Sequence, residues 1–277
     1  MTSSAPPTPP QPLRILMLHG FTQSGPLFRA KTRFLESALK KAFPGGVELA
    51  YPTGPLRLKI SDIPGVRSKP DNGDSYGGED DDTDAWSWVR KDPQTGTWAD
   101  VEASFDYLAE VLRTQGPFDG VIGFSQGAAF AAMLASLLEG PVRVSSFAEH
   151  QPRGGVAFPE SVRSLQQPRF KFAVVYSGFL CPGERYVAFY EPKIETPMLH
   201  FIGSLDGVVD EASSLRLSRA CVGGEARVVY HPGAHFVPGA KPFVRALVGF
   251  LREALQGQDE GSVRAKVNRG ALGGPNL

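Results

Sequence analysis

The sequence has few cysteines and none of the cysteine patterns that stabilise small domains. Its 277 residues include two cysteines, Cys181 and Cys221, which do not form a C-x-x-C pair. Two cysteines cannot build the disulfide framework of a small secreted domain, although one bridge between them remains open. We expect both to be buried as small apolar side chains.

The chain also lacks an excess of charge and a long apolar run. Lysine plus arginine and aspartate plus glutamate both number 29, so the formal net charge is zero. A nucleic-acid-binding domain normally carries a basic excess, and we therefore expect no nucleic-acid partner. The uncharged stretch at residues 126–138 is shorter than the roughly 20 apolar residues of a membrane span. The first residues lack the basic and apolar regions of a secretory signal, which favours a cytoplasmic protein.

The two ends of the chain differ in composition from its middle. Residues 1–12 hold five prolines and no aromatic or branched aliphatic residue, which predicts a disordered leader. Residues 256–277 are polar and rich in glycine, and we expect them to form a tail outside the core. The remaining residues, 13–255, are predicted to form one domain.

Within this domain, apolar strand-like runs alternate with segments of helical periodicity. The predicted strands are residues 14–18, 47–51, 118–124, 172–176, 198–202 and 226–230. The predicted helices are residues 28–43, 98–114, 126–138, 211–221 and 242–255. Such alternation predicts an α/β fold with a mostly parallel central sheet flanked by helices.

Two stretches, residues 56–97 and 145–169, interrupt this alternation. We interpret both as irregular, cap-like loops, because loops of this length in a domain are usually functional or disordered. The first contains an acidic run at residues 78–84. That run lacks the spacing of a calcium-binding loop and is predicted to be a solvated surface.

The strongest chemical signal is a G-x-S-x-G pattern formed by Gly123, Ser125 and Gly127. An apolar strand leads into the pattern and a helix follows it. This strand–turn–helix context is typical of the nucleophile elbow of α/β-hydrolases. Side chains two residues to either side of the serine would collide in so tight a turn, which explains the two glycines. The pattern therefore predicts Ser125 as a nucleophile.

A serine nucleophile needs a histidine base and a carboxylate that orients it. In α/β-hydrolases these follow the serine in the order acid, then histidine. Asp206 and His235 have this order, and each follows a predicted strand. The carboxyl ends of parallel strands share one sheet edge, where open α/β sheets place their sites. We therefore predict a Ser125–His235–Asp206 triad.

Nearby residues offer alternatives for two of these roles. Asp210 precedes the predicted helix at 211–221, where an aspartate is expected as the N-cap. His231 directly follows a strand and precedes a proline, which favours a strand-end role. His19 precedes Ser125 in the chain and follows the first strand, and we expect it to brace the loop there.

The negative charge that develops on an attacked carbonyl needs two backbone N–H donors. One is expected from Gln126, the residue after the nucleophile. The other is expected from the loop after the first strand, with Phe21 as the favoured donor and Thr22 as the alternative. No H-E-x-x-H or comparable ligand cluster occurs in the sequence, so we expect neither a metal nor a cofactor.

Several segments together resemble the FSH family of serine hydrolases, which includes fungal enzymes. They are LHGFTQSG at residues 18–25, FRAKT at 28–32, YPTGP at 51–55, GFSQGA at 123–128, LDGVV at 205–209 and HPGAHFVP at 231–238. The resemblance covers roughly residues 13–255 and does not extend to the two ends of the chain.

The resemblance implies an α/β-hydrolase with esterase or thioesterase activity and the triad named above. The segment around Trp86 and Trp88 resembles an aromatic patch that follows the family's variable acidic loop, and we expect both tryptophans to line the substrate pocket. Some fungal relatives release polyketides from their synthases. An acyl-carrier domain is then a candidate partner beside a small acyl ester or thioester.

The sequence thus predicts a serine hydrolase that cleaves esters or thioesters of a medium, long or polyketide-like acyl group. Two alternatives remain: a dedicated polyketide-releasing thioesterase, and a non-catalytic binding protein on the hydrolase fold, since fold does not imply function. A peptidase is disfavoured because an amide has a poorer leaving group.

Overall fold

The computed structural model describes residues 11–63, 84–92, 94 and 97–271, with side chains as far as residue 257. Its central sheet contains the strands β1 (Leu13–Leu18), β2 (Val47–Ala50), β7 (Gly120–Phe124), β8 (Phe172–Tyr176), β9 (Met198–Gly203) and β10 (Val228–His231). They pair in the order β10-β9-β8-β7-β1-β2, and every neighbouring pair is parallel. Each of the six predicted strands is present, and the predicted parallel sheet is confirmed.

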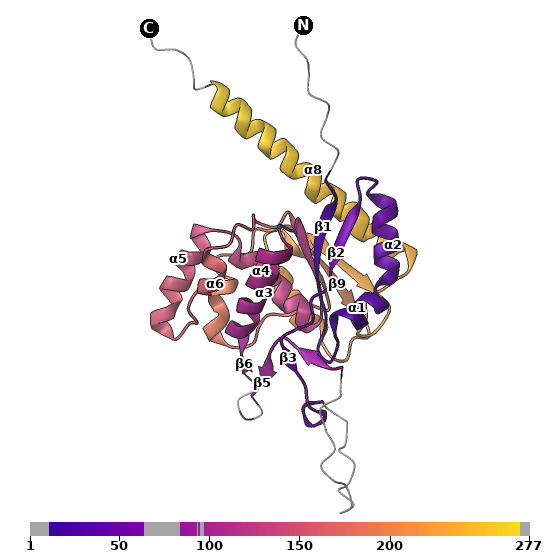
Figure 1. The fold of residues 1–277 in the computed structure, drawn as a ribbon, viewed down its shortest axis with the longest axis vertical. Coiled ribbons are helices and arrows are strands. Elements are labelled where there is room, and N and C mark those ends of the chain that lie inside the picture. Colours follow the sequence, from indigo (N-terminus) through magenta and orange to yellow (C-terminus); the bar gives the residue numbers. More distant parts are fainter. Residues whose placement is uncertain (1–10, 64–83, 93, 95–96, 272–277) are drawn as a thin grey trace, which may run out of the picture.

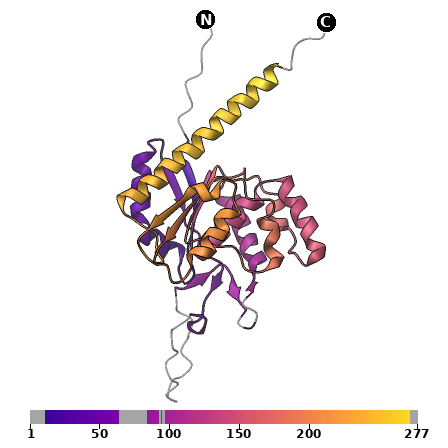
Figure 2. The same ribbon diagram turned by 180° about the vertical axis from the view of Figure 1, so that it is seen from behind.

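Helices cover both faces of this sheet (Figures 1 and 2). They are α1 (Gly25–Lys31), α2 (Arg33–Ala42), α3 (Val101–Gln115), α4 (Gln126–Leu137), α5 (Pro141–His150), α6 (Glu160–Arg163), α7 (Glu211–Arg219) and α8 (Lys241–Ala271). Helices α1, α2 and α8 share one apolar cluster with the sheet, and α3 to α7 lie on the other side.

Strand β1 illustrates why both faces are apolar. Ile15 and Met17 belong to the cluster under α1, α2 and α8, whereas Leu16 and Leu18 belong to the cluster under α3 and α4. Successive side chains of a strand point to opposite faces, so a central strand needs an unbroken apolar run. In the described part of the chain no single helix is long and apolar enough to cross a membrane, while α4 and α5 reach that length and composition only as a pair bent by 107°.

The segment at residues 28–43 forms two helices where the sequence predicts one. Thr32 separates α1 from α2, and its hydroxyl donates to the carbonyl of Phe28 at 2.7 Å. Threonine competes for backbone acceptors in this way, which weakens a helix interior. The apolar period continues across the break, so the pattern alone does not reveal it.

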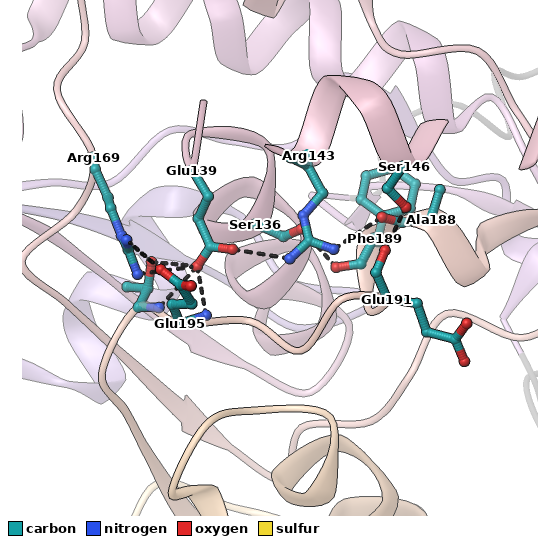
Figure 3. A network of polar contacts seen from close by, with 10 residues as sticks. Ser136, Glu139, Arg143, Ser146, Arg169, Ala188, Phe189, Glu191 and Glu195 are labelled. Carbon is teal, nitrogen blue, oxygen red and sulfur yellow. Dashed lines mark hydrogen bonds and ion pairs between the residues drawn. The ribbon is translucent and has the colours of Figure 1, made fainter. Parts of the chain in front are cut away.

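The stretch at residues 145–169 is more regular than predicted. Most of α5 falls in it, followed by α6. The buried face of α5 carries Arg143 and Ser146 beside Phe147, and such polar residues hide the helical period of an apolar face. Their side chains bind the backbone carbonyls of Ala188 and Glu191 (Figure 3).

The stretch at residues 56–97 contains short strands that the sequence does not predict. Strand β3 (Leu56–Arg57) pairs with β4 (Trp86–Ser87), and β5 (Arg90–Lys91) pairs with β6 (Trp98–Ala99). The helix predicted from residue 98 therefore begins only at α3. Strands of two residues are too short to show a detectable alternation of apolar and polar side chains.

Helix α8 continues well past its predicted end at residue 255, to Ala271, and extends away from the sheet (Figure 1). The expected tail is therefore helical over most of its length. Residues 256–271 contain alanine, lysine and arginine, which favour helices, and no proline interrupts them. Residues 1–10, 78–83 and 272–277, which include most of the expected leader and acidic run, lie outside the described residues.

Candidate active site

Ser125 occupies the turn between β7 and α4 in a backbone conformation that is rare for an L-residue. Its φ is 54° and its ψ is −119°. The N–H of Ser125 donates to the carbonyl of Tyr176 in the neighbouring strand at 2.8 Å, and α4 begins at the next residue. The strained turn is typical of a functional site and places Ser125 at the carboxyl edge of the sheet.

The two glycines of the motif lie where a side chain does not fit. A Cβ on Gly123 would be 2.3 Å from the carbonyl oxygen of Gly127. A Cβ on Gly127 would be 2.3 Å from the carbonyl oxygens of Leu18 and His19. The obstacles are backbone atoms that cannot swing aside, so the turn requires glycine at both positions.

The structure brings Ser125, His235 and Asp206 into one hydrogen-bonded chain. His235 Nε2 is 2.9 Å from Ser125 Oγ, and His235 Nδ1 is 2.8 Å from Asp206 Oδ2. A carboxylate only accepts, so Nδ1 carries the imidazole proton and Nε2 accepts from the serine hydroxyl. Residues separated by 110 and 29 positions in the chain thus meet in the geometry that activates a serine hydroxyl.

Asp206 is held by its own loop as well as by His235. Its Oδ1 accepts from the N–H groups of Val208 and Val209, both at 2.9 Å. Burial raises the pKa of Asp206, but the Val209 N–H, the His235 ring and the Val208 N–H favour the charged form and bring the pKa below its usual value. The carboxylate is therefore ionised and fixed beside the imidazole.

The alternative residues occupy other positions. Asp210 is the N-cap of α7, and its side chain accepts from the N–H of Ser213 at 2.6 Å, as predicted. His231 is the last residue of β10 and is buried. Neither takes part in the hydrogen-bonded chain at Ser125.

His19 is buried against the loop that follows β1. Its Nε2 accepts from the N–H of Gly54 and its Nδ1 donates to the carbonyl of Gly20, both at 2.8 Å. Burial lowers the pKa of His19 to about 4, so the ring is neutral near pH 7. This arrangement agrees with the bracing role expected from the sequence.

The backbone N–H groups of the two expected donors, Phe21 and Gln126, have no acceptor among the described residues. The N–H of Thr22 is engaged with the carbonyl of Trp86 at 2.9 Å. The side chain of Gln126 accepts from the N–H of Trp88 at 2.7 Å, which fixes the start of α4. Of the two donors considered in the first loop, Phe21 is therefore the available one.

The structure corrects the expected position of Trp88. Its side chain is fully buried, its Nε1 donates to the carbonyl of His19 at 2.9 Å, and its ring packs against Phe130. Trp88 supports the loop from behind and does not line a pocket. Trp86 is partly exposed, with its Nε1 donating to Asp84 and its ring under Arg57.

A cavity of about 280 Å³ lies beside the imidazole. Its lining consists of Gln23, Phe28, Lys31, Phe124, His235, Phe236 and Val237. A larger open hollow of about 670 Å³ lies over α1, α2 and β2 and contains none of the three residues of the chain at Ser125. The smaller cavity is therefore the one that belongs to this site.

Sequence reasoning missed these lining residues. Phe124 and Phe236 are the immediate neighbours of Ser125 and His235, and that proximity was an available signal. Phe28 and Lys31 come from α1, and only the packing of α1 on the sheet brings them here. The aromatic residues Phe147 and Phe158 of the second irregular stretch pack in the core.

A parallel sheet of this order with a serine at its elbow defines an α/β-hydrolase. A family model described as "Serine hydrolase (FSH1)" matches residues 8–247. The chain therefore belongs to this family of serine hydrolases, as its resemblance implied.

Similar sequences support this family assignment. Family of serine hydrolases 2 of Saccharomyces cerevisiae is 30% identical over 86% of this chain and 97% of its own. Esterase OVCA2 of Homo sapiens is 33% identical over 87% of this chain and 96% of its own. A Schizosaccharomyces pombe protein named dihydrofolate reductase is 31% identical over 96% of this chain, which spans only 53% of that relative.

Solved structures share the fold at low sequence identity. Esterase PE8 has a TM-score of 0.54 and 19% identity, covering 88% of this chain and 93% of its own. Acyl-protein thioesterase 2 of Zea mays has a TM-score of 0.53 and 19% identity, covering 91% of this chain and 97% of its own. These two comparisons support the architecture alone.

Proposed function

We propose that this serine hydrolase cleaves carboxylic esters or thioesters through an acyl-enzyme on Ser125. The observation that carries the proposal is the continuous hydrogen-bonded chain from Asp206 through His235 to Ser125 at a strained elbow. The N–H groups of Phe21, in the loop after β1, and of Gln126, the residue after the serine, have no acceptor among the described residues. A binding protein has no need of this combination, which supports catalysis over the non-catalytic alternative.

Acyl transfer begins when Ser125 Oγ bonds to the carbonyl carbon and its proton moves to His235 Nε2. The carbonyl oxygen becomes an oxyanion, which the N–H groups of Phe21 and Gln126 stabilise; one such donor lowers a barrier by about 2.7–4 kcal/mol. Asp206 stabilises the imidazolium and holds its tautomer.

His235 then gives its proton to the departing oxygen or sulfur, and the acyl group remains on Ser125. Water releases the acid by the same steps, with His235 first accepting a proton from the water and then returning it to Ser125 Oγ. The active serine is thereby restored.

The apolar lining of the cavity supports an organic group of moderate size beside His235. Its volume lies near the lower end of ligand pockets, about 300–1,000 Å³. We favour general ester or thioester hydrolysis over dedicated polyketide release, because nothing in the described part of the chain argues for an acyl-carrier domain.

Labelling with a fluorophosphonate probe tests the proposal, since only an activated serine reacts. The wild type should react, and Ser125→Ala should stay folded, fail to react and lose several orders of magnitude in kcat. 4-Nitrophenyl esters of rising chain length, measured beside acyl-CoA thioesters with EDTA present, identify the acyl group and leaving atom. Near-wild-type turnover by Ser125→Ala would refute the mechanism.

A further inference from the structure

The cavity beside His235 has an aromatic floor that leads from the imidazole to α1. The ring of His235 contacts Phe124, with ring centroids 4.8 Å apart, and Phe124 stacks on Phe28 at 6.4 Å. Lys31 follows Phe28 by three positions on α1, and residues with that spacing share a helix face. The floor therefore ends beside Lys31, which also lines the cavity.

Lys31 has no hydrogen bond or ion pair with any residue that the structure describes. Two other cations nearby, Arg29 of α1 and Lys40 of α2, both bind Glu36 of α2, and all three residues line the larger hollow. Because Lys31 is exposed at the cavity edge, its charge is available to a bound molecule.

Gln23 is an uncharged polar residue of the same lining, and it also presents a donor. Its Oε1 accepts from the N–H of Gly20 at 3.3 Å, which leaves the side-chain NH₂ group for a ligand. Apart from His235, the polar groups of the cavity are thus both donors, and one is cationic. An apolar cavity with this pair is complementary to an organic group that carries an anion.

The position of His235 identifies the part of the substrate that enters. In acyl transfer the imidazole delivers its proton to the leaving group, so the leaving group lies on the imidazole side of Ser125. The cavity lining includes His235 but neither Ser125 nor the donor residues Phe21 and Gln126. Its location therefore corresponds to the leaving group.

We propose that the preferred substrates carry an anionic leaving group, a carboxylate or a phosphate joined to an apolar body, and that Lys31 and Gln23 bind the anion. The inference rests on the proposed ester or thioester hydrolysis. Lys31 then determines specificity without taking part in bond cleavage.

Matched esters test this inference. The hexanoyl ester of 4-hydroxybenzoate is compared with that of its neutral methyl ester, and the hexanoyl ester of 4-hydroxyphenyl phosphate tests a phosphate in place of the carboxylate. A third comparison moves the charge to the acyl side, with the 4-nitrophenyl monoester of adipate against 4-nitrophenyl hexanoate. Each is measured with wild type, Lys31→Met, Lys31→Arg and Arg33→Met.

For an anionic leaving group, the ratio of kcat/KM for the charged ester to that for the neutral ester should fall about tenfold in Lys31→Met, chiefly through KM. Lys31→Arg should retain most of the ratio, and added salt should lower it in the wild type. Arg33→Met is the control, because Arg33 lines the larger hollow, and it should keep the wild-type ratio. The phosphate and carboxylate pairs together show which anion the site prefers.

An unchanged ratio in Lys31→Met would overturn the inference, and so would a loss confined to the adipate pair. Failure of the proposed function gives a different result. In that case the wild type would hydrolyse none of the neutral esters, or Ser125→Ala would hydrolyse them as well as the wild type.

Discussion

The Asp206 carboxylate accepts three hydrogen bonds, one from His235 and two from its own loop. The two loop bonds orient the carboxylate in addition to the bond from His235, so its position does not depend on the histidine alone. Asp210 lies four residues further on and uses its oxygens to cap α7. Two aspartates in one short segment thus have separate tasks, one electrostatic and one structural.

Substitutions at these two aspartates should separate the tasks. Asp206→Asn should leave the fold intact and lower kcat by about 10⁴, because the imidazole loses its orienting charge and its tautomer. Asp210→Ala should lower the free energy of unfolding by about 1 kcal/mol through the lost cap, with a small change in kcat. Ester hydrolysis and urea unfolding measure both effects, and a large kinetic loss that follows Asp210 would contradict the assignment of the acid.

The buried side chain of His19 makes the stability of the protein depend on pH. Its folded-state pKa of about 4 lies below the usual 6.5 because the ring is buried. Between these values the unfolded chain binds a proton that the folded protein does not. The free energy of unfolding therefore falls as the pH falls from 6.5 towards 4.

Replacing His19 should reduce that slope. In His19→Gln the amide oxygen can still accept from the N–H of Gly54, but the side chain does not titrate. As the pH falls from 6.5 to 4, the free energy of unfolding of this variant should decrease by about 1.4 kcal/mol less per pH unit than that of the wild type. Urea unfolding at a series of pH values measures the slope, and the buried His200 contributes equally to both proteins. Identical slopes would show that His19 is protonated in the fold.

At the scale of elements, the junction of β7 and α4 positions both Ser125 and the N–H group of Gln126. The approach of Gly127 to the carbonyls of Leu18 and His19 brings the start of α4 against the end of β1. The loop with Phe21 leaves β1 at the same place. The contact between these two elements therefore sets the distance between the N–H groups of Phe21 and Gln126.

Gly127→Ala should disturb this contact. The added Cβ would meet backbone oxygen atoms at 2.3 Å, so we expect a loss of about 1–3 kcal/mol in unfolding free energy. A displacement of about 1 Å in such a site can cost 10²-fold in rate, and kcat should fall accordingly.

The control for Gly127→Ala is Gly249→Ala in the middle of α8. A Cβ at Gly249 meets nothing within 4 Å, and this variant should gain about 0.5–1 kcal/mol without a change in kcat. Thermal unfolding and ester hydrolysis are measured for both variants. A Gly127→Ala enzyme with wild-type stability and rate would contradict the importance of this contact.

At the scale of the whole molecule, a buried ion pair joins the outer helices to the sheet (Figure 3). Arg143 Nη2 is 2.9 Å from Glu139, and neither side chain is exposed by more than 6%. Glu139 also accepts from the N–H groups of Glu195 and Thr196 ahead of β9. The pair thus links α4 and α5 to a segment more than fifty residues away.

Removing one partner of this pair should be costly. Arg143→Met leaves the buried Glu139 carboxylate with Arg169, at 3.4 Å, as its remaining cation, and we expect a loss of about 3–5 kcal/mol in unfolding free energy. The double variant Arg143→Met with Glu139→Gln should lose less than the sum of the single losses. Urea unfolding measures these changes.

The exposed pair of Arg113 and Glu110 provides the comparison. Arg113→Met should cost at most about 1 kcal/mol, because water already solvates both charges. If Arg143→Met lowered the free energy of unfolding no more than Arg113→Met does, the buried network would not stabilise the packing of α4 and α5.

The sequence by itself determined the sheet strands, the elbow and the residues that meet there. Each depends on a local pattern: an apolar run for a strand covered on both faces, glycines where backbones touch, and an acid and a histidine after successive strands. These requirements act within a few residues, so they can be detected in the chain before it folds.

Only the tertiary structure decided which side chains surround the site. It placed Trp88 behind the loop and not in a pocket, buried Arg143 beside Glu139, and brought Lys31 to the cavity beside His235. The reason is physical: whether a side chain is buried, paired or left free depends on partners far away in the chain. A periodic pattern carries no information about those partners, because packing alone brings them together.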